Sequence, residues 1–107
     1  MIEVKAGVIF KELKPQIYIL FPLLDSIFDY YNRICVITSA ADGKHMKLSK
    51  HYQGLALDLR SRDFSNDQMK LSVLQKLRDG AGPKYDVLLE HLGNPNEHFH
   101  LEFDPKD

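Results

Sequence analysis

The chain has 107 residues, of which 44% are hydrophobic and 27% charged, so it is predicted to form one globular domain over residues 1–107 rather than a disordered or fibrous protein. The chain has 14 Lys and Arg and 15 Asp and Glu. Its net charge of -1 gives no reason to expect nucleic acid or an anionic membrane as a partner. No stretch approaches the ~20 apolar residues of a membrane span or resembles a secretory signal peptide. We therefore expect a protein that is made in the cytoplasm and stays soluble.

The first half of the chain predicts a helix followed by a buried strand. The first 13 residues contain only a short apolar run, which suits an edge strand or a first turn. From Pro15 to Tyr31, apolar residues recur every three or four positions, as in a helix that buries one face. Pro22 has no N–H to donate, so the helix should be kinked or restarted there. Residues 34–38, ICVIT, predict a strand, and Cys35 within it should be a core residue rather than a nucleophile.

A long polar segment and an alternating strand come next. Residues 39–52 are rich in small and polar side chains and have no periodicity, which predicts a long loop of the kind that often carries function. Leu55 to Arg60 then alternates, so its leucines should face the core while Asp58 faces the other way. Small residues beside Asp58 leave space for a ligand.

The C-terminal part predicts a helix and a hairpin. Ser65 and Gln68 have the spacing of a capping box, and the helix that follows should end at Gly80. Tyr85–Leu89 and His98–Phe103 are predicted to pair as an antiparallel hairpin. Together the elements predict an α+β fold, with a small antiparallel sheet and helices packed on one face.

The main chemical signal is a candidate metal site made from two distant segments. His51 and Asp58 lie seven positions apart across the loop and strand, and His98 and His100 alternate, so both leave the same face of the last strand. Two imidazoles and one carboxylate suit zinc, with a fourth position left for water or substrate, although manganese, cobalt or iron could use the same ligands. Each histidine alone would be an ordinary polar residue, and a metal-free domain is the simplest competing hypothesis.

Two glutamates could act as the general base that a metal-dependent hydrolase needs. If the hairpin turn spans residues 92–96, Glu90 faces His98 and is a diagonal neighbour of His100. Glu97 should then point away from the histidine pair, unless the strand begins only after it. Its Glu-x-x-His spacing to His100 nevertheless keeps it as the second candidate.

Further residues could complete the site. His45, in the long loop, could fold over the metal and donate to a developing oxyanion, or it could be a surface histidine. Glu102 has the same strand parity as His100, so it could hydrogen-bond within the site or lie in solvent. Four cations could bind a substrate carboxylate or form part of the solvated surface: Lys44, Lys47, Lys50 and Arg60.

The run DGKHMKLSKHYQGLALDLR, with HFHLE near the C-terminus, resembles the zinc D-alanyl-D-alanine carboxypeptidase and endolysin family. The family signature is S-x-H-x-x-G-x-A-x-D followed by a late histidine, and its specified positions are occupied here by Ser49, His51, Gly54, Ala56 and Asp58. The chain is also similar to the zinc-bearing signalling domain of hedgehog proteins. It is most like the small single-domain members of bacteriophage and bacterial genomes, over about residues 34 to 104.

The resemblance implies a hedgehog-like zinc fold with one Zn²⁺ per chain. His51, Asp58 and His100 would be the ligands, His98 a neighbouring catalytic group, and Glu90 the general base that takes a proton from a water activated by zinc. It further implies a peptidase that cleaves peptidoglycan stem peptides, either between two D-alanines or between L-alanine and D-glutamate. Such a protein would act as a monomer on a wall peptide after export or phage-induced lysis.

Two departures from the family pattern affect the expected site. Many members have an arginine after the strand that binds the reacting carbonyl or a substrate carboxylate, whereas this chain has Asp42, so His45 takes over that role or the substrate differs. The hairpin loop is also longer than the family turn, which leaves Glu97 as a rival to Glu90. The alternative function, which the hedgehog resemblance permits, is a non-catalytic binding domain stabilised by zinc.

Overall fold

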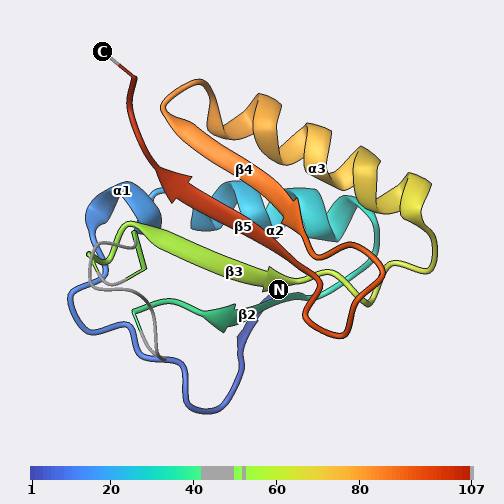
Figure 1. The fold of residues 1–107 in the computed structure, drawn as a ribbon, viewed down its shortest axis with the longest axis horizontal. Helices are drawn as coiled ribbons and strands as arrows, with labels where there is room; N and C mark the ends of the chain where they lie inside the picture. The colour runs from blue at the N-terminus through green and yellow to red at the C-terminus, as the bar shows by residue number, and fades with distance from the viewer. Residues whose placement is uncertain (42–49, 52, 107) are drawn as a thin grey trace.

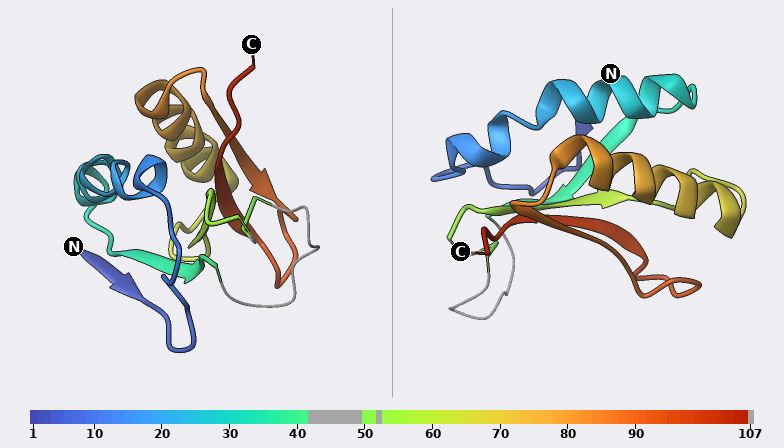
Figure 2. Two further views of the ribbon diagram at one scale, coloured as in Figure 1. Left: turned by 90° about the vertical axis from the view of Figure 1, so that its left-hand side faces the viewer. Right: turned by 90° about the horizontal axis from the view of Figure 1, so that it is seen from above.

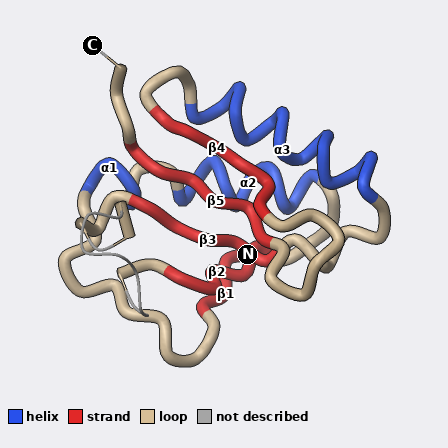
Figure 3. The backbone as a smooth tube through the Cα atoms, viewed as in Figure 1, coloured by secondary structure: helices blue, strands red, loops and turns tan. Residues whose placement is uncertain are grey.

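The computed structural model describes residues 1–41, 50–51 and 53–106, and it confirms an α+β fold. Three helices lie on one side of a five-stranded sheet of order β1-β2-β3-β5-β4, and no helix of the described residues covers its other side (Figures 1, 2 and 3). The helices are α1 (Pro15–Tyr18), α2 (Phe21–Tyr30) and α3 (Asp67–Ala81). The strands are β1 (Ile2–Val4), β2 (Cys35–Ser39), β3 (Ala56–Arg60), β4 (Tyr85–Glu90) and β5 (His98–Phe103).

The sheet is mixed, which corrects the expectation of a wholly antiparallel one. Strand β1 pairs in parallel with β2, while β2, β3, β5 and β4 are antiparallel to their neighbours. The chain between β1 and β2 passes through α1 and α2 on one face, and such a crossover returns the chain to the sheet in its original direction. The first residues gave no clear signal for β1.

Local sequence sets the helix boundaries. The restart near Pro22 was predicted correctly, whereas the N-cap of α3 was predicted wrongly. The first helical segment ends before Pro22, which lies in the first turn of α2, where its missing N–H needs no partner. The N-cap of α3 is Asn66 rather than Ser65, because the Asn66 side chain accepts a hydrogen bond from the Met69 N–H at 2.8 Å. The helix also runs past Gly80 and ends at Ala81, with Gly82 as its C-cap.

The core lies between the helices and the sheet. Phe28, Phe64 and Phe99 are almost fully buried, and their ring centroids lie 5.5–6.4 Å apart. Cys35 is fully buried, as predicted, and burial raises the pKa of its thiol to about 12, which keeps it protonated and unreactive. No helix in the described ranges has the length and apolar character needed to cross a membrane.

Candidate metal centre

The polar face of the sheet carries two cross-strand rows of functional side chains. In one row Asp58 of β3 pairs with His100 of β5, and in the next Arg60 pairs with His98, which pairs in turn with Glu90 of β4. This register confirms the predicted pairing of Glu90 with His98. The alternating leucines of β3 enter the core, as expected, and so leave the carboxylate of Asp58 on the polar face.

A register shift lies beside Asp58. Ile37 pairs with Leu59, but Ser39 pairs with Asp58, so β2 has one more residue than β3 between these two pairs. Irregularities of this kind re-aim side chains and are frequent next to functional sites. The shift was not visible in the sequence.

His51 and His100 converge on one oxygen of Asp58. His51 Nε2 lies 3.0 Å from Asp58 Oδ1, and His100 Nδ1 lies 2.8 Å from the same atom. The exposed fraction of the side chain is only 6% for His51, 10% for His100 and 13% for Asp58. Two distant segments are thus brought together around one carboxylate, as the sequence motif predicted.

The other nitrogen of each ring has a hydrogen-bond acceptor. His51 Nδ1 lies 2.7 Å from the Ala40 carbonyl oxygen, and His100 Nε2 lies 2.7 Å from Glu102 Oε1. Each ring can donate its proton there, which leaves the nitrogen that faces Asp58 free to be a ligand. Metal-binding histidines usually have such partners, because these fix the ring orientation and the tautomer. Glu102 therefore belongs to the site, one of its two expected roles.

The charges of the site are compatible with a bound cation. Burial alone would raise the pKa of Asp58, but hydrogen bonds from His100 and His51 outweigh burial and hold that pKa well below its usual range. Burial alone would lower the pKa of His100, whereas hydrogen bonds to Asp58 and Glu102 raise it to about 9. Without a metal, Asp58 and Glu102 favour a proton on the His100 ring, and a divalent ion can supply that positive charge instead.

The donor set fits zinc. Bonds of about 2.0–2.1 Å in tetrahedral geometry place ligand atoms about 3.3 Å apart, a little more than the observed separations of 2.8 and 3.0 Å. Each imidazole nitrogen is thus at nearly the separation from Asp58 Oδ1 that a shared ion requires. His51, Asp58 and His100 form one group of residues that could hold it.

A second, overlapping group could also hold a metal ion. Single ligand atoms of Asp58, Glu90, His98 and His100 all lie within 4.8 Å of one another. The two groups share Asp58 and His100 and differ in whether His51 or the Glu90–His98 pair completes the site. The metal itself is not fixed by these distances.

Glu90 and His98 form a pair at the edge of the site. His98 Nδ1 lies 2.6 Å from the Asn96 carbonyl oxygen and donates its proton there, and its Nε2 lies 3.0 Å from Glu90 Oε1. Glu90 Oε1 is also 3.8 Å from His100 Nδ1, and 36% of the Glu90 side chain is exposed. Glu90 is therefore both close to the ligands and accessible.

Glu97, the rival base, points away from the histidines and anchors the hairpin instead. Its carboxylate accepts hydrogen bonds from the Ser61 hydroxyl, from Lys70 Nζ at 2.9 Å and from the Gly93 N–H at 3.0 Å. Burial alone would raise the pKa of Glu97, but the bonds from Ser61 and Lys70 outweigh it and lower the pKa. The Glu97 carboxylate is thus engaged by three donors, and residue 97 lies just before strand β5.

Glu97→Gln should lower the free energy of unfolding by about 2 kcal/mol, because it replaces charge-assisted hydrogen bonds with neutral ones. Since the pKa is lower in the folded protein, the stabilisation is present above the unfolded pKa of a glutamate and is lost as the pH falls through the folded value. Urea unfolding across this acidic range measures both effects. Equal stability of the variant and the wild type at neutral pH would contradict the anchoring role.

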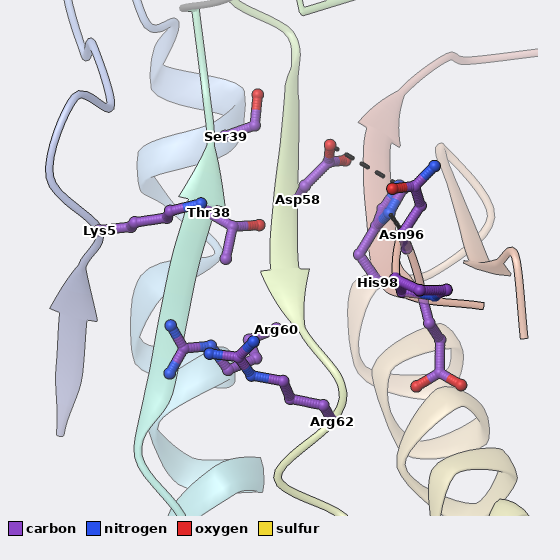
Figure 4. A pocket seen from close by; sticks show the side chains of 10 residues that line it. Lys5, Thr38, Ser39, Asp58, Arg60, Arg62, Asn96 and His98 are labelled. Atoms are coloured by element: carbon purple, nitrogen blue, oxygen red, sulfur yellow. Dashed lines mark hydrogen bonds and ion pairs between the residues drawn. The ribbon is translucent and has the colours of Figure 1, made fainter. Parts of the chain in front are cut away.

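Several expected site residues lie outside the described residues: His45, Asp42, Ser49, Lys44 and Lys47. Of the other two cations expected to bind a carboxylate, Lys50 Nζ lies 3.8 Å from Asp104 Oδ1 and Arg60 lines a pocket. Figure 4 shows this pocket, in which Asp58 and His98 face Arg60, Arg62 and Lys5 across a hollow. Lys5 and Arg62 were missed because no local motif joins them to the site.

Comparison of the chain with protein-family models, with characterised proteins and with solved structures gives no match.

Proposed function

We propose that the protein is a zinc-dependent peptidase of the hedgehog and D-alanyl-D-alanine carboxypeptidase type that hydrolyses peptidoglycan stem peptides. The observation that carries the proposal is the convergence of His51 Nε2 and His100 Nδ1 on Asp58 Oδ1, with a Glu90–His98 pair directly beside them. A purely structural zinc site needs four protein ligands and no adjacent base. Three ligands next to an accessible carboxylate favour chemistry.

The metal and the base divide the chemistry between them. When bound, zinc would polarise a peptide carbonyl and lower the pKa of a water molecule. Glu90, with Oε1 3.8 Å from His100 Nδ1, is close enough to the ligands for its carboxylate to take a proton from the attacking water and then to deliver it to the leaving amine. His98 orients Glu90, since its own ring is fixed through the Asn96 carbonyl oxygen.

The test is the digestion of purified peptidoglycan by the wild type and Glu90→Gln, with zinc content determined for both. We expect the wild type to release new amino groups, to lose activity with a chelator and to regain it with zinc. Glu90→Gln should lose at least about 100-fold in rate while it keeps its zinc, because it removes only the proton acceptor. Mass spectrometry of the products, either free D-alanine or a new amino-terminal D-glutamate, identifies the bond.

Glu97→Gln is the matched control, because it makes the same chemical change seven residues away, at the other end of the hairpin loop. Below its unfolding temperature it should still cleave, since the Glu97 carboxylate is bonded to Ser61, Lys70 and Gly93 rather than placed among the ligands. Equal losses in Glu90→Gln and Glu97→Gln would contradict the assignment of the base. A protein that binds zinc stoichiometrically but cuts no wall peptide would instead support the zinc-stabilised binding domain.

A further inference from the structure

We propose that Lys5, Arg60 and Arg62 form a cationic wall that binds a carboxylate of the substrate next to the bond that is cleaved. This inference rests on the proposed peptidase function and adds its substrate preference: a peptide with an anionic group beside the scissile amide. The three side chains come from the segment after β1, from β3 and from the segment after β3. They meet only in the folded protein.

The wall is one side of a pocket of about 310 Å³. This volume is at the lower end of the usual range for ligand pockets, so it suits one end of a peptide rather than a whole wall fragment. Thr38 and Asn96 add neutral polar groups to the lining, and Asp58 and His98 connect the pocket to the metal group (Figure 4). A ligand group in this pocket would therefore lie beside the reacting atoms.

The charges in the pocket leave a positive surplus. Its two carboxylates are already engaged: Asp58 with His51 and His100, and Glu97 with Lys70. By contrast, Lys5, Arg60 and Arg62 have no ion-pair partner within the ranges the structure describes. Clefts lined by one sign of charge concentrate ligands of the opposite sign, and guanidinium groups suit the two oxygens of a carboxylate.

The position of Arg60 links the wall to the catalytic pair. Arg60 is directly opposite His98 in the β3–β5 register, and His98 is opposite Glu90 in the β5–β4 register. An anion held by Arg60 is thus next to His98 and two strands away from the general base. Both bonds considered for the peptidase meet this requirement, since cleavage between two D-alanines releases a residue with a free carboxylate and D-glutamate brings a carboxylate of its own.

The experiment compares two probes that differ only in charge, N-acetyl-D-alanyl-D-alanine and its C-terminal amide. Dissociation constants are measured by titration calorimetry on zinc-supplemented protein with the Glu90→Gln substitution, so that the probe is not consumed. We expect the acid to bind at least about tenfold more tightly than the amide, and salt to weaken the acid alone. Adding Arg60→Gln and Arg62→Gln together should remove this preference, while adding Lys76→Gln and Lys84→Gln together, an equal loss of two charges at exposed positions that do not line the pocket, should retain it.

Equal binding of acid and amide, no detectable binding of the acid, or a preference that survives Arg60→Gln with Arg62→Gln would overturn the inference. The last result would mean that the carboxylate is bound elsewhere, for instance by the metal. Inorganic phosphate is the third probe. If phosphate binds more tightly than the acid, the inference that the wall binds a carboxylate is overturned. These outcomes do not depend on turnover, so they are distinct from a failure of the wild type to cleave peptidoglycan.

Discussion

Asp58→Asn is expected to lower the affinity for zinc by roughly 100-fold or more, because loss of a supporting contact alone typically costs 10- to 100-fold and here a ligand charge is lost. Asparagine keeps the size of the side chain but removes the charge on which two imidazoles converge. Peptidase activity should fall in parallel and should recover in part at high zinc concentration. Competition with a chromophoric chelator measures the affinity.

Substitutions of His51 and His98 separate the two overlapping groups of ligands. His51→Gln should lose affinity about as strongly as Asp58→Asn, whereas His98→Gln should keep its zinc and change the rate of hydrolysis instead. The two histidines differ in their fixed partners, since His51 donates to the Ala40 carbonyl and His98 to that of Asn96. The opposite pattern, with zinc lost only in His98→Gln, would assign the metal to the group that contains Glu90.

Gly54→Ala is expected to destabilise the protein by more than about 3 kcal/mol, for two reasons that act together. The φ angle of Gly54 is +74°, which side chains other than glycine rarely adopt, and an added Cβ would clash with the carbonyl oxygen of Glu12. The Lys14 N–H also donates to the Gly54 carbonyl at 2.9 Å, so the two segments cannot separate freely. Thermal or urea unfolding measures the loss.

Gly93→Ala is the matched control for Gly54→Ala. Gly93 has a similar φ of +83°, but nothing lies within 4 Å of an added Cβ. It should therefore cost only the backbone strain of about 1 kcal/mol. Similar losses in both variants would show that the contact with Glu12 contributes little, and that Gly54 is required for its backbone angle alone.

Periodicity and spacing were sufficient for the elements that have a strong local signal. The restart of the helix at Pro22, the alternation around Asp58 and the pairing of Glu90 with His98 each follow from a rule that acts within a few residues. The pairing places Glu90 beside the histidine pair, whereas the carboxylate of Glu97 is bonded to Lys70.

Features that depend on distant segments could not be predicted. The parallel pairing of β1 depends on a crossover through α1 and α2, and the register shift beside Asp58 depends on how β2 meets β3. The cationic wall joins Lys5 to Arg60 and Arg62 across more than half the chain, with no motif between them. Ser65 and Asn66 have similar preferences for the N-cap position, so the sequence could not decide between them. In the folded chain Asn66 is the N-cap.

The most direct test of the account is a crystal structure of the zinc-loaded protein with anomalous data collected at the zinc edge. We predict one strong peak per chain, at about 2.0–2.2 Å from His51 Nε2, His100 Nδ1 and one oxygen of Asp58, with Glu90 nearby but not bound. A peak bound by Glu90 and His98 without His51, or no peak in this group, would contradict both the ligand set and the role of Glu90 as the base.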